Sequence, residues 1–176
     1  MNPRVEMTAP GASPWRIVGL AGAGLGLLAA TALIDPAPRL VWNASASVPV
    51  GLYWRADKPL RRDALAVLQL PEAVRALADR RGYLPADVPL IKPVAALPGD
   101  QICVQDNRIA INGDDVARRL VTDSRGNPMP HWTGCRVLDG EVFVLAADVP
   151  DSFDGRYFGP VPVHAITGTL TPLWTR

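Results

Sequence analysis

The sequence predicts a mainly β domain with one short inserted helix, following an N-terminal apolar helix. Turn-forming residues are abundant, with 18 Pro and 15 Gly among 176 residues, and aromatic residues make up only 6%. Apolar residues fall in many short runs between these turn signals. This combination is typical of an all-β domain rich in turns. The length is sufficient for one domain with a substantial core.

An uncharged run over residues 17–34, IVGLAGAGLGLLAATALI, is the candidate membrane segment. Its length is near the lower limit for a helix that crosses a bilayer. A signal anchor is the favoured interpretation. A cleaved signal peptide is the second, because Ala30-Thr31-Ala32 resembles a small-x-small cleavage site. A buried core helix is disfavoured, because the run lacks a polar face.

Arginines flank this run unevenly. Arg4 and Arg16 precede it and Arg39 follows it, which weakly favours a cytoplasmic N-terminus. The sequence therefore predicts three parts along the chain. They are a cytoplasmic tail over residues 1–16, a transmembrane signal anchor over 17–34 and an exported domain over 35–176.

Predicted strands over residues 52–56 and 64–70 precede the one predicted helix. Pro71-Glu72 opens this helix, because Pro suits the first helical position and Glu the positive end of the helix dipole. Gly82 suits its end. Two hairpins follow, the second through Asp139-Gly140, a strong two-residue turn signal. The remaining predicted strands cover residues 101–104, 108–111, 136–138, 141–145 and 166–174, with polar loops over 120–131 and 148–160.

Composition argues against some functions. A formal net charge of +1 argues against nucleic-acid binding, which favours a clearly basic domain. The two cysteines, Cys103 and Cys135, form no C-x-x-C pair, so no structural zinc site is expected. Of the 18 basic residues only Lys58 and Lys92 are lysines. This rarity makes each lysine a candidate for a specific role.

The first candidate site is the stretch Asn43–Tyr53, which contains Ser45 and Ser47. If the stretch is extended, the two serines face the same side. Pro49 stiffens the chain just after them, and Gly51 allows a turn or the close approach of another segment. A hydroxyl held in a rigid segment is what a serine nucleophile needs. The alternative is a polar loop between the anchor and the first strand.

Lys92 is the second candidate, because it is the one charge in the apolar run over residues 88–99. Burial would lower its pKa and leave a neutral amine near neutral pH. Such an amine can take the proton of a serine hydroxyl as a general base. The alternative is a lysine whose stem packs on the core while its ammonium reaches water. A Ser-His-Asp triad is disfavoured, because G-x-S-x-G is absent and neither His131 nor His164 has a catalytic context.

The third candidate is the stretch Asp151–Gly159. Asp154 and Arg156 would lie on one side of an extended chain, where they could pair. Ser152 could hydrogen-bond a nearby amine. The alternative is an ordinary solvated turn, in which such a pair contributes little to stability.

In this order, behind an apolar N-terminal segment, the three stretches resemble the signal peptidase I superfamily, and most closely its TraF-type branch of conjugative-transfer, pilin-processing peptidases. The motifs that carry the resemblance are SASVPVGLY, IKPVAALPGD and DSFDGRYFGP. The family implies a signal-peptidase-like β domain with a Ser-Lys dyad. Ser47 resembles its nucleophile and Lys92 its general base. The Ser45 hydroxyl and the Ser47 N–H resemble its oxyanion hole.

The resemblance also assigns supporting residues. Ser152 matches the serine that orients the lysine, and Asp154 and Arg156 match the structural acid–base pair beside the site. In TraF-type proteins an aspartate of this motif also matters for activity, and Asp154 is its match. An exported domain would lie in an oxidising compartment, where Cys103 and Cys135 would form a disulfide. Two buried free thiols are the alternative.

The resemblance implies a membrane-anchored serine endopeptidase that removes a leader or terminal segment from an exported propilin in conjugative transfer by type IV secretion. In some TraF-type systems the substrate's own N-terminus resolves the acyl-enzyme and gives a cyclic pilin. The enzyme would be a single-pass protein of the bacterial inner membrane with a periplasmic catalytic domain. Its partners would be the propilin or another exported preprotein, membrane lipid and the conjugative mating-pair apparatus, with no nucleic acid, metal or cofactor.

Three departures separate the chain from general signal peptidases. Ser47-Val48-Pro49 is one residue shorter than Ser-Met-x-Pro, Pro93 rather than Arg follows the lysine, and Ala146–Pro150 replaces a Gly-Asp-Asn-Arg run. A general type I signal peptidase is one alternative, and a non-catalytic β scaffold of the secretion apparatus is another. A self-cleaving regulator of the repressor type is disfavoured by the anchor and by the absence of a helix-turn-helix module.

Overall fold

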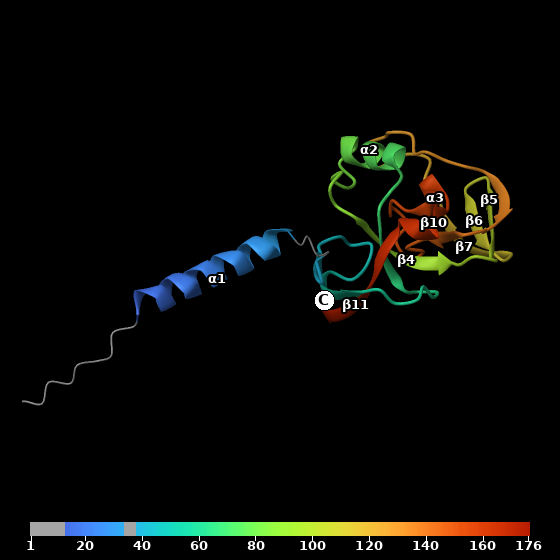
Figure 1. The fold of residues 1–176 in the computed structure, drawn as a ribbon. Coiled ribbons are helices and arrows are strands. Elements are labelled where there is room, and N and C mark those ends of the chain that lie inside the picture. The colour runs from blue at the N-terminus through green and yellow to red at the C-terminus, as the bar shows by residue number, and fades with distance from the viewer. Residues whose placement is uncertain (1–12, 34–37) are drawn as a thin grey trace, which may run out of the picture. The chain divides into compact units, whose positions relative to one another are not determined.

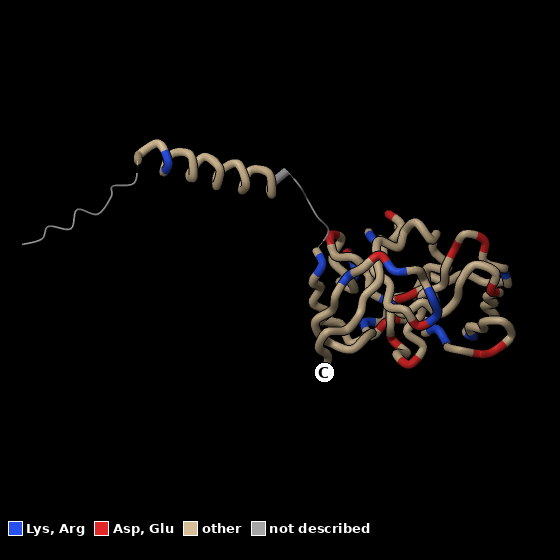
Figure 2. Tube along the Cα trace, turned by 60° about the horizontal axis from the view of Figure 1, so that its bottom comes forward, with Lys and Arg blue, Asp and Glu red and all other residues tan. Residues whose placement is uncertain are grey.

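The computed structural model describes residues 13–33 and 38–176, which belong to two units divided between Ala37 and Pro38. The first unit contains the helix α1 (Pro14–Leu33), whose one charged residue is Arg16 (Figures 1 and 2). Its window Pro14–Thr31 has a mean hydropathy of 1.2, so its length and composition suit a bilayer crossing. Residues 1–12 of the predicted tail and position 34 of the predicted anchor lie outside the described residues.

The second unit is mainly β, as predicted, and consists of two antiparallel sheets (Figure 1). Acidic and basic residues are interspersed around it (Figure 2). The larger sheet has seven strands, in the order β1 (Leu40–Asn43), β2 (Gly51–Ala56), β11 (Ile166–Thr175), β3 (Leu65–Leu68), β4 (Leu90–Ala96), β9 (Glu141–Val144) and β10 (Val161–Pro162). The smaller has four, in the order β7 (Asp114–Arg118), β6 (Arg108–Ile111), β5 (Gln101–Gln105) and β8 (Gly134–Val137).

The inserted helix α2 (Glu72–Arg80) begins and ends where the local sequence predicts. Pro71 precedes it, and Glu72 lies in its first turn. After its C-terminus Gly82 adopts a positive φ of 66°, which glycine tolerates best. The Gly82 N–H donates to the carbonyl of Asp79 at 2.9 Å, and the next N–H donates to that of Ala78 at 2.8 Å. This is a Schellman motif, which satisfies the last carbonyls of the helix.

Strand β4 supplies a row of buried residues to the core of the domain. Leu90, Lys92, Val94 and Ala96 are all buried, and the residues between them are half-buried. Because side chains alternate across a strand, Lys92 occupies a position that this pattern would give to an apolar residue. Leu90 and Val94, which flank it on the buried face, belong to a core cluster that also contains Phe153.

The second predicted hairpin is wrong. β8 pairs with β5 and β9 pairs with β4, so the turn Leu138–Gly140 carries the chain from one sheet to the other. Residues Val142–Val144 are fully buried, whereas all four residues of β8 are exposed. A strand buried on both faces needs a place inside the larger sheet, which pairing with an exposed edge strand would not provide. The predicted loop over 148–160 also differs, because α3 (Gly155–Phe158) forms within it.

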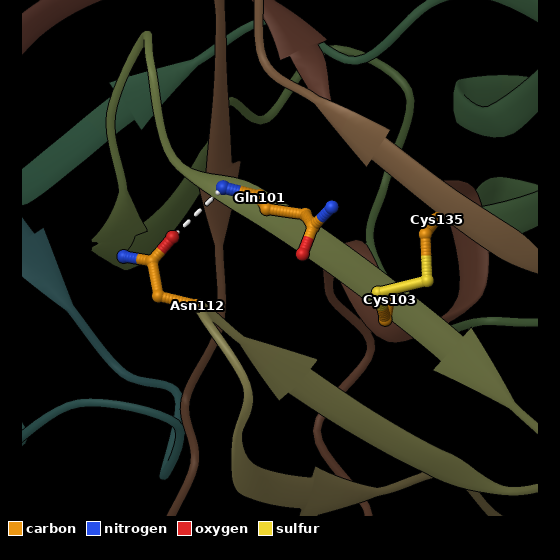
Figure 3. Close-up of a disulfide and its surroundings, with 4 residues drawn as sticks. All are labelled: Gln101, Cys103, Asn112 and Cys135. Atoms are coloured by element: carbon orange, nitrogen blue, oxygen red, sulfur yellow. Dashed lines mark hydrogen bonds between the residues drawn. A yellow bond between two sulfur atoms is a disulfide. The ribbon is translucent and has the colours of Figure 1, made fainter.

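A disulfide joins Cys103 and Cys135, which face each other on β5 and β8 (Figure 3). Their Cα atoms are 4.0 Å apart. The predicted disulfide is therefore confirmed, and the alternative of two free thiols is wrong. Beside it, the Asn112 side chain accepts a hydrogen bond from the Gln101 N–H at 2.9 Å, which fixes the start of β5 (Figure 3). The bridge ties the exposed strand β8 to the rest of the smaller sheet.

Candidate active site

Ser45 and Ser47 lie in the loop over residues 44–50, which joins β1 to β2. The loop makes a turn at residues 46–47, so the condition under which the two serines would face the same side of an extended stretch is not met. Gly51 follows it at a point where a Cβ atom would lie 2.1 Å from the carbonyl oxygen of Trp174. The glycine is therefore required by the close approach of β11, as the sequence allowed for.

The loop is held by Asn43, to which the sequence analysis gave no role. Its buried amide nitrogen donates to the carbonyls of Ser45 at 2.9 Å and of Val48 and Pro49 at 3.1 Å each. Its amide oxygen accepts from the N–H of Ser45 at 3.1 Å and from the Ser45 hydroxyl at 2.8 Å. The Tyr53 hydroxyl donates to the Pro49 carbonyl at 2.6 Å. The one available sequence signal was an Asn before a serine-containing loop, a common local hydrogen-bonding arrangement.

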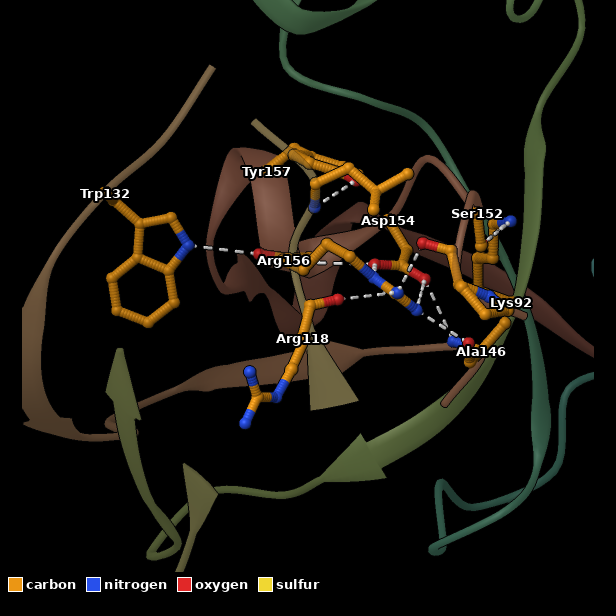
Figure 4. Close-up of polar contacts among 11 residues, drawn as sticks. Lys92, Arg118, Trp132, Ala146, Ser152, Asp154, Arg156 and Tyr157 are labelled. Atoms are coloured by element: carbon orange, nitrogen blue, oxygen red, sulfur yellow. Dashed lines mark hydrogen bonds and ion pairs between the residues drawn. The ribbon is translucent and has the colours of Figure 1, made fainter. Parts of the chain in front are cut away.

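Lys92 is 2% exposed, and a 2.6 Å hydrogen bond joins its Nζ to the Oγ of Ser152 (Figure 4). Burial lowers the pKa of Lys92 from its usual 10.5 to about 8, and the carboxylate of Asp154 partly offsets this shift. The alternative of an ammonium that reaches water is wrong, since the whole residue is buried. An appreciable fraction of the amine is therefore neutral near neutral pH.

Asp154 and Arg156 form a fully buried ion pair rather than a pair on a solvated turn (Figure 4). The guanidinium donates to the carboxylate at 2.8 and 3.1 Å, and also to the carbonyls of Ala146, Pro150 and Arg118. Asp154 also accepts the N–H of Ala146 at 3.0 Å and caps α3. Because buried charges need such complete pairing, the pair fixes the segment that presents Ser152 to Lys92.

These segments enclose a cavity of about 520 Å³. Ser45, Ser47, Lys92 and Ser152 all line it, so the structure brings the four predicted polar residues to one place. The hydrogen bonds within residues 38–176 join Lys92 to Ser152 and not to Ser47. Ser47 and Lys92 thus line one cavity without a hydrogen bond between them. A serine hydroxyl and a partly neutral amine at one cavity are the groups that acyl transfer by a Ser-Lys pair requires.

One wall of the cavity comes from the predicted polar loop over 120–131 and from Tyr83, for which the sequence suggests no role. The Tyr83 hydroxyl, from the segment after α2, donates to Asp123 at 2.5 Å. This bond from Tyr83, followed by the bond from the Asn127 side chain, holds the pKa of Asp123 below its ordinary range. The backbone N–H groups of Asn127 and Arg125 also donate to Asp123 and lower its pKa further. The Tyr83 ring lies 5.1 Å from that of Phe153, next to Ser152. No sequence pattern marks this contact, because its partners are 40 residues apart.

Both histidines are exposed, and neither is among the residues that line this cavity. The described part of the domain therefore offers no imidazole to Ser45 or Ser47. The buried amine of Lys92 lines the same cavity as the two serines, together with the carboxylates of Asp123 and Asp151. The geometry favours the Ser-Lys interpretation over a Ser-His-Asp triad.

Comparison with known proteins gives one matching family model, described as "Signal peptidase, peptidase S26", over residues 14–174. Plasmid transfer protein TraF of Escherichia coli is 33% identical over 165 residues, covering 88% of this chain and 92% of that protein. Conjugal transfer protein TraF of Agrobacterium fabrum (strain C58) is 38% identical over 146 residues, covering 76% and 81%. A crystal structure of a signal peptidase I from Enterococcus faecalis aligns with a TM-score of 0.39 and 22% identity, covering 66% of this chain and 100% of that chain.

Proposed function

The chain belongs to the signal peptidase family, peptidase S26, and we propose that it is a membrane-anchored serine endopeptidase that removes a leader or terminal segment from an exported propilin in conjugative transfer. The observation that carries the chemistry is the buried amine of Lys92, which shares one cavity with Ser45, Ser47 and Ser152. The names of the TraF relatives, which align over most of their length, support the conjugative setting.

Acylation begins when the Ser47 hydroxyl attacks the scissile carbonyl carbon. Neutral Lys92 takes the hydroxyl proton as the new C–O bond forms, and the carbonyl electrons move to the oxygen. The lysine then returns this proton to the leaving amine as the peptide C–N bond breaks. Ser152, 2.6 Å from Nζ, orients the amine through both steps. Asp154 and Arg156 support this geometry from outside the cavity.

The oxyanion of the tetrahedral intermediate is held by the Ser47 N–H and the Ser45 hydroxyl. Removing one such donor typically lowers kcat by about 10²–10³-fold. Water then attacks the acyl-enzyme while Lys92 accepts its proton, and Ser47 leaves with that proton restored. Attack by the amino terminus of the substrate in place of water would give a cyclic product that is lighter by one water.

The proposal places α1 in the bacterial inner membrane and the catalytic domain in the periplasm, as part of a conjugative mating-pair apparatus. Two observations support an exported domain behind an anchor. α1 has the length and composition of a membrane-spanning helix, and the Cys103–Cys135 disulfide suits an oxidising compartment. The substrate segment is expected to bind as an extended strand, the usual mode for such peptides.

The test is the terminal mass of a candidate propilin co-expressed with the full chain. Wild type is compared with Ser47→Ala, Lys92→Ala and Ser45→Ala. Wild type should trim the precursor, the first two variants should leave it intact, and the third should slow trimming strongly. A general exported preprotein with an Ala-x-Ala site, expressed in parallel, measures substrate range.

Each outcome separates one alternative. If Ser47→Ala trims the precursor as wild type does, the assignment of Ser47 as the nucleophile is wrong, and a non-catalytic scaffold becomes the favoured function. Equal processing of the propilin and the general preprotein would favour a general type I signal peptidase. A product lighter than the linear peptide by one water would establish cyclisation.

A further inference from the structure

Asn43 is the residue around which the Ser47 loop is built, and it has no part in the steps above. It ends β1 and pairs with Gly51, the first residue of β2, so it stands at the base of the loop. It is 4% exposed, yet every polar atom of its side chain is bonded within the loop. A buried amide with this many partners fixes its surroundings, because breaking the set would leave buried polar groups unpaired.

The orientation of the Asn43 amide follows from its partners. Three carbonyl oxygens surround one end, so that end must be the NH₂ donor. The N–H of Ser45 faces the other end, which must be the oxygen. An amide oxygen cannot donate, so the 2.8 Å bond to the Ser45 hydroxyl requires that hydroxyl to be the donor. A serine hydroxyl has a single proton, and here Asn43 holds it.

We propose that Asn43 is a positioning residue: its amide oxygen holds the Ser45 hydroxyl ready, and the hydroxyl turns from Asn43 to donate its hydrogen bond to the oxyanion as negative charge develops. The proposal rests on the function given above. Ser45 lines the cavity beside Ser47. Rotation about its Cβ–Oγ bond exchanges one acceptor for another, and no covalent bond is made or broken. The Ser45 N–H bond to Asn43 remains, so the loop keeps its shape during the exchange.

This exchange favours the transition state over the bound substrate. A neutral substrate carbonyl is about as good a hydrogen-bond acceptor as the Asn43 amide oxygen. Moving the Ser45 hydroxyl from Asn43 to that carbonyl therefore adds little to substrate binding. An oxyanion is a much stronger acceptor, because hydrogen bonds to a charged partner are about twice as strong. An interaction realised only in the transition state raises kcat and leaves KM nearly unchanged.

The experiment is a double-mutant cycle between Asn43→Ala and Ser45→Ala. It uses the full chain in detergent and the propilin precursor that wild type trims in the preceding test. Ser45→Ala, which removes the donor, should lower kcat by about 10²–10³-fold. Asn43→Ala, which leaves the donor misplaced, should lower kcat by about 10–100-fold. KM should change by less than about threefold in both variants. The double variant should be no more than about threefold slower than Ser45→Ala alone, because Asn43 acts through Ser45.

Tyr53→Phe is the matched control. It removes the 2.6 Å bond to the Pro49 carbonyl of the same loop without touching Ser45. If Tyr53→Phe lowers kcat, it should do so by the same factor in the wild-type and Ser45→Ala backgrounds. Thermal unfolding of every variant checks the fold. If Asn43→Ala is unfolded at the assay temperature, Asn43→Ser replaces it in the cycle.

If Asn43→Ala lowers kcat by the same factor in the Ser45→Ala background as in wild type, the two losses multiply. That result would overturn the positioning role and leave Asn43 a structural residue of the loop. A loss confined to KM would overturn it as well. Retained activity in Ser47→Ala is a different failure, since it would overturn the proposed function itself. If wild type trims no precursor, the function fails and this inference fails with it.

Discussion

Lys92 is the proposed general base, and its surroundings would set the pH range in which the proposed site is active. Its pKa of about 8 predicts that kcat/KM rises about tenfold per pH unit below 8 and levels off above it, because only the neutral amine accepts a proton. A pH–rate profile from 6 to 10 measures this. The exposed carboxylate of Asp151 raises the pKa of Lys92, so Asp151→Asn should move the midpoint to lower pH. A flat profile, or a midpoint near 10.5, would exclude Lys92 as the base.

The same burial predicts that Lys92 weakens the fold. Below pH 8 the lysine is charged in both states, and the folded state bears the cost of burying an ammonium. Between pH 8 and 10.5 the unfolded chain binds more protons, so the free energy of unfolding rises with pH. At pH 6, Lys92→Met should therefore have a free energy of unfolding about 1–3 kcal/mol larger than that of wild type, and a higher Tm. This difference in stability should narrow above pH 8.

Lys58→Met is the control for this measurement, because Lys58 is the other lysine and is exposed. It should show no comparable pH-dependent gain. A Lys92→Met variant that is less stable than wild type at pH 6 would mean that the Ser152 and Asp154 contacts outweigh the cost of burial. The expected result would show that stability is given up at this position for the sake of a reactive amine.

At the scale of elements, the bridge between β5 and β8 should contribute substantially to stability. Its cysteines are separated by 32 residues, for which the loop-entropy estimate is about 3–4 kcal/mol. Cys103→Ala with Cys135→Ala should lower the free energy of unfolding by about this amount in a denaturant titration. Wild type under reducing conditions should behave like the double variant. Because neither cysteine lines the cavity, kcat at a temperature where the variant is folded should be unchanged. A loss below about 1 kcal/mol would contradict the estimate.

Elements with local signals could be predicted from the sequence, and those defined by distant partners could not. The helix after Pro71 and its end at Gly82 depend on a few adjacent residues, and both were predicted. Asp139-Gly140 gives a turn but does not say which strands pair on either side of it. The exposure of β8 and the burial of β9 decide that pairing, and both depend on the rest of the fold. The same distinction holds for Asn43 and for Tyr83 with Asp123, whose contacts exist only once the chain is folded.

For the whole molecule, the division between Ala37 and Pro38 predicts that the second unit folds without α1, the proposed anchor. The buried apolar residues of the described chain extend from Val48 to Leu170, all within the second unit. A chain beginning at Pro38 should show cooperative thermal unfolding and should cleave a soluble peptide that contains the scissile site. It should process a membrane-inserted precursor at least about tenfold more slowly than the full chain, because anchoring raises the effective concentration of substrate. The truncated Ser47→Ala chain is the control, and non-cooperative unfolding would contradict the prediction.

The sequence also predicted the overall class, the family and the residues Ser45, Ser47, Lys92 and Ser152, which the structure brings to one cavity. The mainly β class followed from turn residues and short apolar runs, and the family followed from three motifs in order. Physical reasoning alone found Ser47, Lys92 and the 151–159 stretch as three separate candidates. It could not show that one cavity unites them, because that depends on how the Asn43 loop turns and on a buried ion pair at Asp154 that fixes the last segment.

The smaller sheet is formed by one continuous segment of the chain, residues 101–137, whose two ends are hydrogen-bonded to each other. Gln101 pairs with Val137, and the residues just outside them are joined where the Leu138 N–H donates to the Asp100 carbonyl at 2.8 Å. Residues between these ends form one wall of the cavity, whereas the two serines and Lys92 come from the larger sheet and its loop. Changing the length of a segment closed in this way costs little free energy. The length and side chains of this wall can therefore change while the two serines and Lys92 keep their places. If the proposed function holds, substrate selectivity could then vary independently of the catalytic residues.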